Sequence, residues 1–291
     1  MCEKLRLVFP QWQGGESNNI ASYVTELEPK VAAQGYVIGS ELLQWLAPVS
    51  TVPMEKVPVS LDDSPEAIAT ENGIFAYQAN KKQLKAALDI LHIKKPKKIV
   101  TLGGDCAVSV APFTYLANQY PDDVAILWID AHPDLGVPGD SYTGFHAMAL
   151  AQSLGLGDKE ITTMLPKTVH PSNALLVGLR DFGEPAEQRR KDLKIPYISC
   201  EVANKSSKEI LDWIKQTGKS KILIHFDLDV LEPTQLKIAV GYDPNGLHIE
   251  AVTRIISDVA KNYDLVGLTV AEPMPREVIK LRALLHSLPI F

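Results

Sequence analysis

The sequence predicts an α/β fold in which a parallel sheet is covered by helices on both faces. Apolar runs and amphipathic runs alternate almost to the end of the chain, and several apolar runs are nearly continuous. Strands that are buried on both faces have this character, whereas strands with one solvated face alternate apolar and polar residues. Because parallel strands need crossover connections, the alternation predicts a helix between most pairs of strands.

In the first half of the chain, "LRLVF" (5–9) is apolar and predicts a strand. Residues 74–93 space their leucines at helical intervals with lysines between them, which predicts an amphipathic helix. "KKIVTLGG" (97–104) predicts a strand that ends in glycines. Residues 107–119 follow it as a helix, and "VAILWID" (124–130) predicts the next strand.

In the second half, Ser206 or Ser207 is a candidate N-cap and Glu209 lies in the first turn of a predicted helix. That helix covers residues 206–216. The polar stretch 184–193 is helix-prone too. The remaining expected elements are strands at 173–180, 196–199, 221–229 and 264–272 and helices at 248–262 and 276–288.

Composition places the chain among ordinary globular proteins and predicts a single domain over residues 1–291. The 291 residues are 46% hydrophobic and 22% charged, and no repeat or low-complexity tract divides them. The net charge of −6 disfavours nucleic-acid binding and attraction to anionic membranes. Three cysteines, no apolar leader at the N-terminus and no long apolar run together predict a cytoplasmic protein.

Four predicted strands end in side chains that bind metals or transfer protons. These ends are "GGDC" (103–106), "DAHPD" (130–134), "DLD" (227–229) and Glu272. The carboxyl ends of parallel strands meet at one edge of a sheet, where ligands bind. The sequence therefore predicts one site at this edge.

The spacing of the acids favours divalent metals at that site. Asp130, His132 and Asp134 follow one strand at alternate positions, and Asp227 and Asp229 follow another. Alternate residues share a face if the chain stays extended. Carboxylates packed together repel each other and resist burial unless cations compensate them. Oxygen-rich ligands with one or two imidazoles suit Mn, with Fe, Ni, Co or Zn as further candidates, and two such ions can hold a nucleophilic hydroxide.

Structural interpretations compete with this one. Either acid pair alone is more typical of a turn or a cap, and His146 and Glu272 alone are more typical of a helix start and a solvated strand end. "GGDC" is also compatible with a phosphate-binding turn, although it lacks the glycine pattern of nucleotide-binding loops. The two acid pairs together, both after apolar strands, favour the metal site.

The motifs taken together resemble those of the arginase/agmatinase/formimidoylglutamase family, the ureohydrolases. The resemblance covers about residues 97–291 and rests on "GGDC", "WIDAHPD", "GFHAM", "VGLRD", "HFDLDVLEP" and "GLTVAEPMP" in the family's order. It implies a three-layer α/β/α fold with a mostly parallel sheet of about eight strands. It also implies two manganese ions and a hydrolase that cleaves the C–N bond of a linear amidine with a metal-bound hydroxide, often releasing urea.

The resemblance also assigns roles to residues of this chain. Asp130 and Asp227 are expected to bridge the two metals, Asp134 to complete one site, and His132 and Asp229 to complete the other. His146 matches a proton shuttle that contacts substrate, and Glu272 matches the acid that holds the guanidinium group. Thr143, near His146, is a further expected substrate contact. Asp181 in "VGLRD" is expected to be structural.

Cys106 departs from the family's pattern, which has a histidine metal ligand at this place. A thiolate there would favour Zn, Fe or Ni over Mn, and a neutral thiol would leave one metal short of a ligand. Cys106 is thus either a ligand or only a small buried residue. The chain is accordingly either an active hydrolase or a degenerate, non-catalytic or single-metal regulatory relative.

The substrate loops depart as well. Gly136 stands where arginases have an asparagine, and Gly183 stands where they have an acid that grips the amino-acid end of arginine, although Glu184 or Glu187 would be substitutes. Arginine, agmatine, another guanidino compound and formimidoylglutamate all remain candidate substrates. A dinuclear phosphoesterase is the remaining enzyme class, but an expected Asn-His-Asp element is missing. By resemblance, the protein is expected to be a homo-oligomer, a trimer or hexamer.

Overall fold

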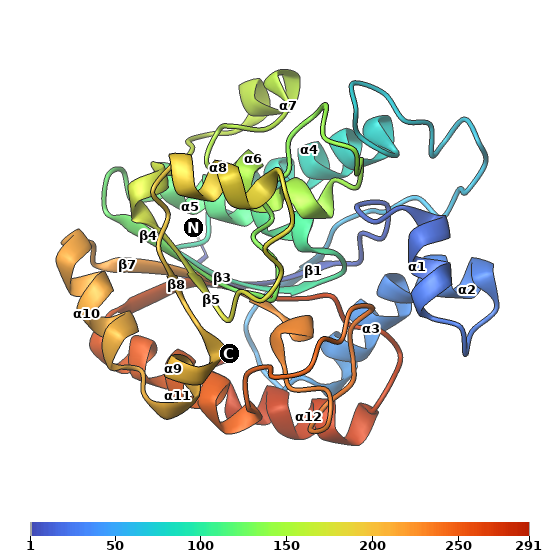
Figure 1. The fold of residues 1–291 in the computed structure, drawn as a ribbon. Helices are drawn as coiled ribbons and strands as arrows, with labels where there is room; N and C mark the ends of the chain where they lie inside the picture. The colour runs from blue at the N-terminus through green and yellow to red at the C-terminus, as the bar shows by residue number, and fades with distance from the viewer. Residues whose placement is uncertain (1, 291) are drawn as a thin grey trace.

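The computed structural model describes residues 2–290, which form one sheet between two layers of helices (Figure 1). Within these residues the sheet has eight strands in the order β2-β1-β3-β8-β7-β4-β5-β6, and every pairing is parallel. The strands are β1 (Lys4–Phe9), β2 (Met54–Lys56), β3 (Lys98–Gly103), β4 (Val124–Ile129), β5 (Ala174–Val177), β6 (Tyr197–Ile198), β7 (Lys221–Asp227) and β8 (Asp264–Ala271). The predicted α/β class and strand number are confirmed, and the sheet is fully rather than mostly parallel.

Helices cover both faces of the sheet, with α4, α5, α6 and α8 on one side and α3, α9, α10, α11 and α12 on the other (Figure 1). The helices are α1 (Ser17–Tyr23), α2 (Pro29–Ala33), α3 (Gly35–Leu46), α4 (Tyr77–Lys94), α5 (Val110–Gln119), α6 (Ala149–Ser153), α7 (Lys159–Met164), α8 (Ala186–Asp192), α9 (Cys200–Lys205), α10 (Lys208–Thr217), α11 (Ile249–Asn262) and α12 (Val278–Ser287). Each layer encloses its own apolar core. One core includes Trp128 and Phe113, and the other includes Phe226 and Ile256. Burial on both faces explains the continuous apolar strands.

The expected elements match the observed ones apart from their ends. The strand expected at 173–180 stops at Val177 because Gly178 adopts a left-handed backbone with φ of 92°. The helix expected at 107–119 begins as a 3₁₀ turn, Cys106–Ser109, before α5. Ser207 is the N-cap residue of α10, but its side chain does not cap the helix. Strand β2 and helices α1, α2, α3, α6, α7 and α9 were not expected, and all of these except α3 are at most seven residues long.

The strand order places the strand ends that carry the predicted site residues next to one another. Strands β3, β8, β7 and β4 are consecutive neighbours at the centre of the sheet, and they are the four whose carboxyl ends carry the predicted site residues. Parallel pairing puts these four ends at one edge, as the sequence predicts. Within residues 2–290, no helix has both the length and the apolar character needed to cross a membrane.

Helix α3 approaches the sheet edge closely through a glycine. A methyl group on Gly39 would overlap the backbone carbonyl of Pro273, the residue after Glu272. A methyl group on Gly35, in the same helix, would meet only the flexible end of the Met274 side chain. The close approach of α3 thus depends on Gly39.

We expect Gly39→Ala to lower the free energy of unfolding by about 1–3 kcal/mol, the usual cost of overpacking, although alanine ordinarily stabilises a helix. Gly35→Ala is the matched control and should cost less, because a methionine side chain can move. Urea denaturation of the two variants measures both values. Equal losses would contradict the view that the Pro273 backbone is the rigid partner.

Candidate functional site

The acids at the carboxyl edge of the sheet converge through tight turns rather than through extended chain. The Asp130 carboxylate accepts a hydrogen bond from the His132 backbone N–H at 2.7 Å, and the Asp227 carboxylate accepts one from the Asp229 N–H at 2.7 Å. The chain is therefore not extended beyond either strand, and the condition under which alternate residues would share a face is not met. Each strand-end aspartate instead folds the next residues back over itself, which brings its neighbours to the same place.

One group of candidate ligands comes from β4 and β7. The His132 Nδ1 atom lies 2.8 Å from Asp229 Oδ2 and 3.5 Å from Asp130 Oδ1. Ligand atoms of these three residues all lie within 4.8 Å of one another, so they have the spacing of a metal site. Burial acts to lower the pKa of His132, but the Asp229 and Asp130 carboxylates outweigh it and raise that pKa well above its ordinary value.

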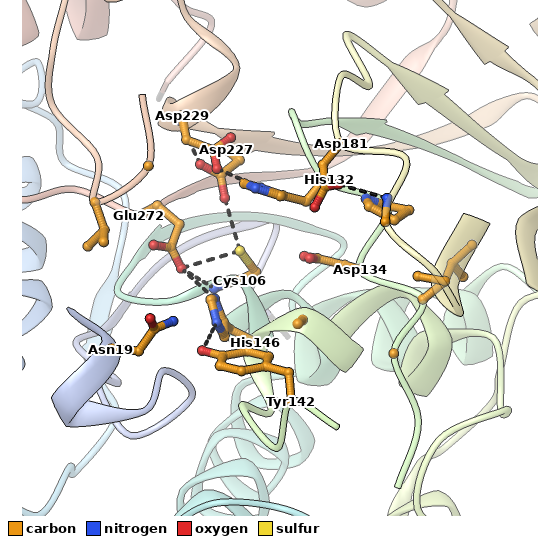
Figure 2. Close-up of a pocket in the computed structure, with 18 of the residues that line it drawn as sticks. Asn19, Cys106, His132, Asp134, Tyr142, His146, Asp181, Asp227, Asp229 and Glu272 are labelled. Atoms are coloured by element: carbon orange, nitrogen blue, oxygen red, sulfur yellow. Dashed lines mark hydrogen bonds and ion pairs between the residues drawn. The ribbon is translucent and has the colours of Figure 1, made fainter. Parts of the chain in front are cut away.

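A second group surrounds Cys106 at the end of β3. The Cys106 thiol lies 2.9 Å from Asp227 Oδ2 and 3.3 Å from Glu272 Oε1 (Figure 2). Cys106, Asp130, Asp227 and His225 form one set of candidate ligands, and Cys106, His146 and Glu272 form another. Burial and the surrounding aspartates raise the pKa of the Cys106 thiol well above its ordinary value. A thiol without a cation beside it would therefore stay protonated, whereas a bound metal would ionise it.

Asp134 also points into this site, with one carboxylate oxygen that has no hydrogen-bond partner. Its side chain is buried beside Cys106, and Asp134 Oδ2 makes no hydrogen bond (Figure 2). Burial and the Asp130 charge raise the pKa of Asp134 well above its ordinary value. Asp134 has a positive φ of 45°, and Glu272 has one of 64°, a conformation that costs a non-glycine residue about 1–2 kcal/mol. The fold therefore holds both carboxylates in strained positions.

Glu272 is fixed from three sides. Its carboxylate accepts a hydrogen bond from the Tyr36 hydroxyl on α3 and another from the Cys106 backbone N–H at 3.2 Å. His146 Nδ1 lies 3.4 Å from Glu272 Oε1, and His146 Nε2 lies 2.7 Å from the Tyr142 hydroxyl. Burial acts to lower the pKa of His146, but the charge interaction with Tyr142 and the Glu272 carboxylate raise it well above its ordinary value.

These side chains line a cavity of about 590 Å³ that opens at the carboxyl edge of the sheet (Figure 2). Its wall includes Cys106, His132, Asp134, His146, Asp227, Asp229 and Glu272. Nearer the rim lie Asn19, Tyr23, Tyr142, Asp181, Glu184, Tyr242 and Asp243. In the part of the chain that the structure describes, no lysine or arginine lines the cavity.

Some residues with expected roles lie outside the cavity. Thr143 turns away, and its hydroxyl donates a hydrogen bond to Glu16 at 2.7 Å. Glu187, one of the two candidate substitutes for the missing acid, is buried against Arg190 and Lys191. Glu184, the other candidate, does line the cavity.

Several residues of the site were not predicted from the sequence. Tyr36 and Asn19 come from the N-terminal region, where no motif indicated a site. Tyr142 lies four residues before His146, so a hydroxyl close to a histidine was the available clue. His225 stands inside the quoted "HFDLD" motif, but its position before the acids did not indicate a ligand.

The donor set fits divalent cations. Two buried side-chain atoms at the site lack any hydrogen-bond partner, Asp134 Oδ2 and His225 Nε2. Burial and neighbouring carboxylates also raise the pKa values of Asp227 and Asp229. Orphaned ligand atoms and crowded buried carboxylates are both relieved by a bound metal ion.

Known proteins show the same fold and related sequences. Residues 44–280 match the model of the Arginase family. An arginase from Entamoeba histolytica is 26% identical over 184 residues, which are 61% of this chain and 62% of that protein, so the match spans under two thirds of the relative.

Among solved structures, Entamoeba histolytica arginase in complex with L-ornithine superimposes with a TM-score of 0.79 at 18% identity, covering 98% of this chain and 96% of that chain. Formimidoylglutamase from Bacillus subtilis superimposes with a TM-score of 0.68 at 16% identity, covering 99% and 88%. The family match covers most of the sequence and includes every strand end that carries the site: the chain belongs to the arginase family.

Proposed function

We propose that the protein is a metal-dependent hydrolase that cleaves a C–N bond of a linear amidine, most consistently a guanidino compound. The observation that carries this proposal is the convergence of Asp130, His132, Asp134, Asp227 and Asp229 beside Glu272 at one edge of the sheet, where all of them except Asp130 line one acidic cavity. Membership of the arginase family supports the reaction class. The geometry supports the three groups that the reaction needs: metal ligands, a carboxylate for the substrate cation and a proton donor.

The aspartates, His132 and Cys106 would hold two divalent cations. Asp130 belongs to both the group around Cys106 and the group around His132, and it would be shared together with Asp227. Asp134 and Cys106 would complete one position, and His132 and Asp229 the other. When bound, such cations lower the pKa of water and so supply a nucleophile near neutral pH. Mn is our first candidate, because most of these ligands are oxygens, with Ni, Fe or Zn as alternatives.

Glu272 would hold the cationic end of the substrate. Its carboxylate faces the cavity beside Cys106 and Asp227, and the Tyr36 hydroxyl and Cys106 N–H keep it in place. A guanidinium carbon is a poor electrophile, so it must be held at close range to the attacking group. A fixed carboxylate also pairs with the planar guanidinium through charge-assisted hydrogen bonds.

His146 would deliver a proton to the departing amine. One ring nitrogen faces Glu272 and the other accepts from or donates to the Tyr142 hydroxyl. The Glu272 carboxylate and Tyr142 both favour the protonated imidazole, which is the form that can act as an acid. His146 thus stands next to the carboxylate that would orient the substrate.

The cavity rim favours a substrate whose far end is cationic or neutral. Asp181, Glu184 and Asp243 line it, and among the described residues no basic side chain does. A substrate carboxylate would find no cation there, whereas an amine would be attracted. This favours agmatine-like guanidino compounds over arginine. The structure of the Entamoeba arginase holds L-ornithine, an amino acid, so arginine stays in the test panel.

A second candidate function is a degenerate or single-metal regulatory relative. The observation that favours it is Cys106, which is buried at a place where the family resemblance implies a histidine ligand. Such a protein would bind metal incompletely and release no urea. The homo-oligomeric state remains a prediction of the resemblance, and the cytoplasmic location remains a prediction from the sequence.

We expect the chelator-treated protein to be inactive and to release urea or ammonia from guanidino substrates after Mn, Ni, Fe or Zn is added. The panel should contain agmatine, arginine, guanidino acids and formimidoylglutamate, with a generic phosphate ester as the test of phosphoesterase activity. Metal content must be measured in parallel. A protein loaded with each metal that turns over none of these amidines would contradict the proposed hydrolase.

Glu272→Gln is expected to lower kcat/KM for the active substrate by at least about tenfold, because it removes the charge from a hydrogen bond worth about 1.5–3 kcal/mol. Steady-state kinetics measures the effect. Glu201→Gln is the control, since this exposed acid pairs with Lys205 on α9, away from the cavity. Unchanged kcat/KM in Glu272→Gln would show that Glu272 does not bind the cation.

Cys106→His separates the two candidate functions. If the protein is an active hydrolase, wild type should turn over substrate, and Cys106→His should alter the preferred metal. A wild-type protein without turnover that gains at least about tenfold activity as Cys106→His would instead be a degenerate relative. Urea release and bound metal per chain, measured on both proteins, give the answer.

A further inference from the structure

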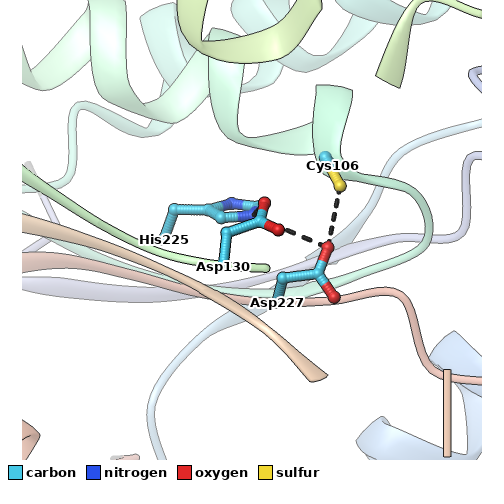
Figure 3. Close-up of side chains that lie close together, drawn as sticks. All are labelled: Cys106, Asp130, His225 and Asp227. Atoms are coloured by element: carbon cyan, nitrogen blue, oxygen red, sulfur yellow. Dashed lines mark hydrogen bonds and ion pairs between the residues drawn. The ribbon is translucent and has the colours of Figure 1, made fainter. Parts of the chain in front are cut away.

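His225 brings an imidazole to the site at which this chain, with Cys106, lacks the histidine of the family's pattern. It lies on β7, two residues before Asp227, and its buried ring lies beside the Asp130 carboxylate (Figure 3). His225 does not line the cavity. Its ligand atom nevertheless lies within 4.8 Å of those of Cys106, Asp130 and Asp227.

The orientation of the His225 ring is fixed by two contacts. The ring stacks on Trp128 with a centroid distance of 3.7 Å and an interplanar angle of 9°. The Nδ1 atom lies 2.8 Å from the Ser109 hydroxyl. These contacts leave Nε2 facing the carboxylates. A ligand histidine typically has its other nitrogen held in this way by a neighbouring polar group.

The free His225 nitrogen has the spacing of a ligand rather than of a hydrogen-bond partner. Nε2 lies 3.6 Å from Asp130 Oδ2 and 4.0 Å from Asp227 Oδ2, and it makes no hydrogen bond. Both distances are too long for hydrogen bonds. Two ligand atoms on one cation, each bound at about 2.0–2.3 Å, lie roughly 3–4 Å apart. Buried polar atoms are rarely left unpartnered, so this atom needs an explanation.

We propose that His225 and Cys106 together bind one of the two metals, with Asp130 and Asp227, in a buried site of one sulfur, one nitrogen and carboxylate oxygens. The proposal rests on the metal centre of the proposed function and adds His225 to its ligands. Cys106 enters from the end of β3 and His225 from β7, on opposite sides of β8 in the sheet. The imidazole missing at position 106 is thus supplied by another strand.

This ligand set makes the two metal positions chemically different. A thiolate and an imidazole favour Zn, Co or Fe, whereas carboxylates with one imidazole suit Mn. The position between His132 and Asp229 would keep the oxygen-rich character. The protein should therefore hold a borderline metal at the Cys106 position more tightly than it holds Mn there.

Cobalt provides the test, because a thiolate bound to Co²⁺ gives a charge-transfer band in the near ultraviolet. The chelator-treated full-length protein is titrated to saturation with Co²⁺, and X-ray absorption of the Zn²⁺-loaded protein counts the sulfur and imidazole neighbours. Wild type should show the band, a sulfur neighbour, and more imidazole than His132 alone supplies. Absence of the band and of sulfur at saturation would overturn the proposal.

Variants identify the two residues. Cys106→Ser should abolish the band, whereas Cys200→Ser, which changes a buried cysteine away from the site, should keep it. His225→Gln should keep the band but lose one imidazole neighbour and weaken Co²⁺ binding by at least roughly tenfold. His286→Gln, on α12, is the control. Imidazole counts that stay equal in wild type and His225→Gln would mean that His225 only packs against Trp128, and would refute its role.

If His225→Gln does not fold, the imidazole count of wild type still decides. A count that His132 alone explains would overturn the proposal. This test of the metal ligands can fail or succeed independently of the proposed hydrolase activity. A sulfur- and His225-bound metal in a protein that hydrolyses no amidine would support this site and refute the enzyme. An active enzyme without metal–sulfur contact would support the hydrolase and refute this site.

Discussion

The main physical constraint on this structure is the repulsion among buried carboxylates at the carboxyl edge of one parallel sheet, which must be compensated. Asp130, Asp134, Asp227, Asp229 and Glu272 are all buried there. In the described part of the cavity wall, the only basic side chains are imidazoles, chiefly His132 and His146. Burial and mutual repulsion raise the pKa values of Asp134, Asp227 and Asp229. Such an arrangement is stable only with protons or cations among the oxygens.

Much of the surrounding fold can be understood as support for these carboxylates. The sheet order brings four loaded strand ends together, and the strand-end aspartates turn the chain back through bonds to the N–H groups two residues on. Trp128 donates its indole N–H to Asp130 at 2.9 Å and stacks on His225. Tyr36 donates a hydrogen bond to Glu272 from α3, on the face of the sheet opposite to α4 and α5 (Figure 1). Each contact orients a ligand-type group without neutralising its charge.

The sequence predicted the centre of the fold and of the site better than their surroundings. Apolar strands that end in acids are readable, because burial on both faces and the shared strand edge leave few arrangements. The turns after Asp130 and Asp227 were not predicted, since alternation alone does not tell an extended chain from a side-chain–backbone turn. Tyr36 was missed because its contact with Glu272 joins segments far apart in the sequence. His225 was missed because a histidine inside an apolar strand is usually a core residue.

The central claim is that divalent cations, rather than shared protons, compensate the buried acids. A crystal structure of the Mn²⁺-loaded protein, with anomalous scattering from the metal, tests it most directly. Two anomalous peaks are expected, one bounded by His132 and Asp229 and one bounded by Cys106 and Asp134, with Asp130 and Asp227 contacting both. Carboxylates that hydrogen-bond to one another at saturating metal, with no anomalous peak among them, would contradict it.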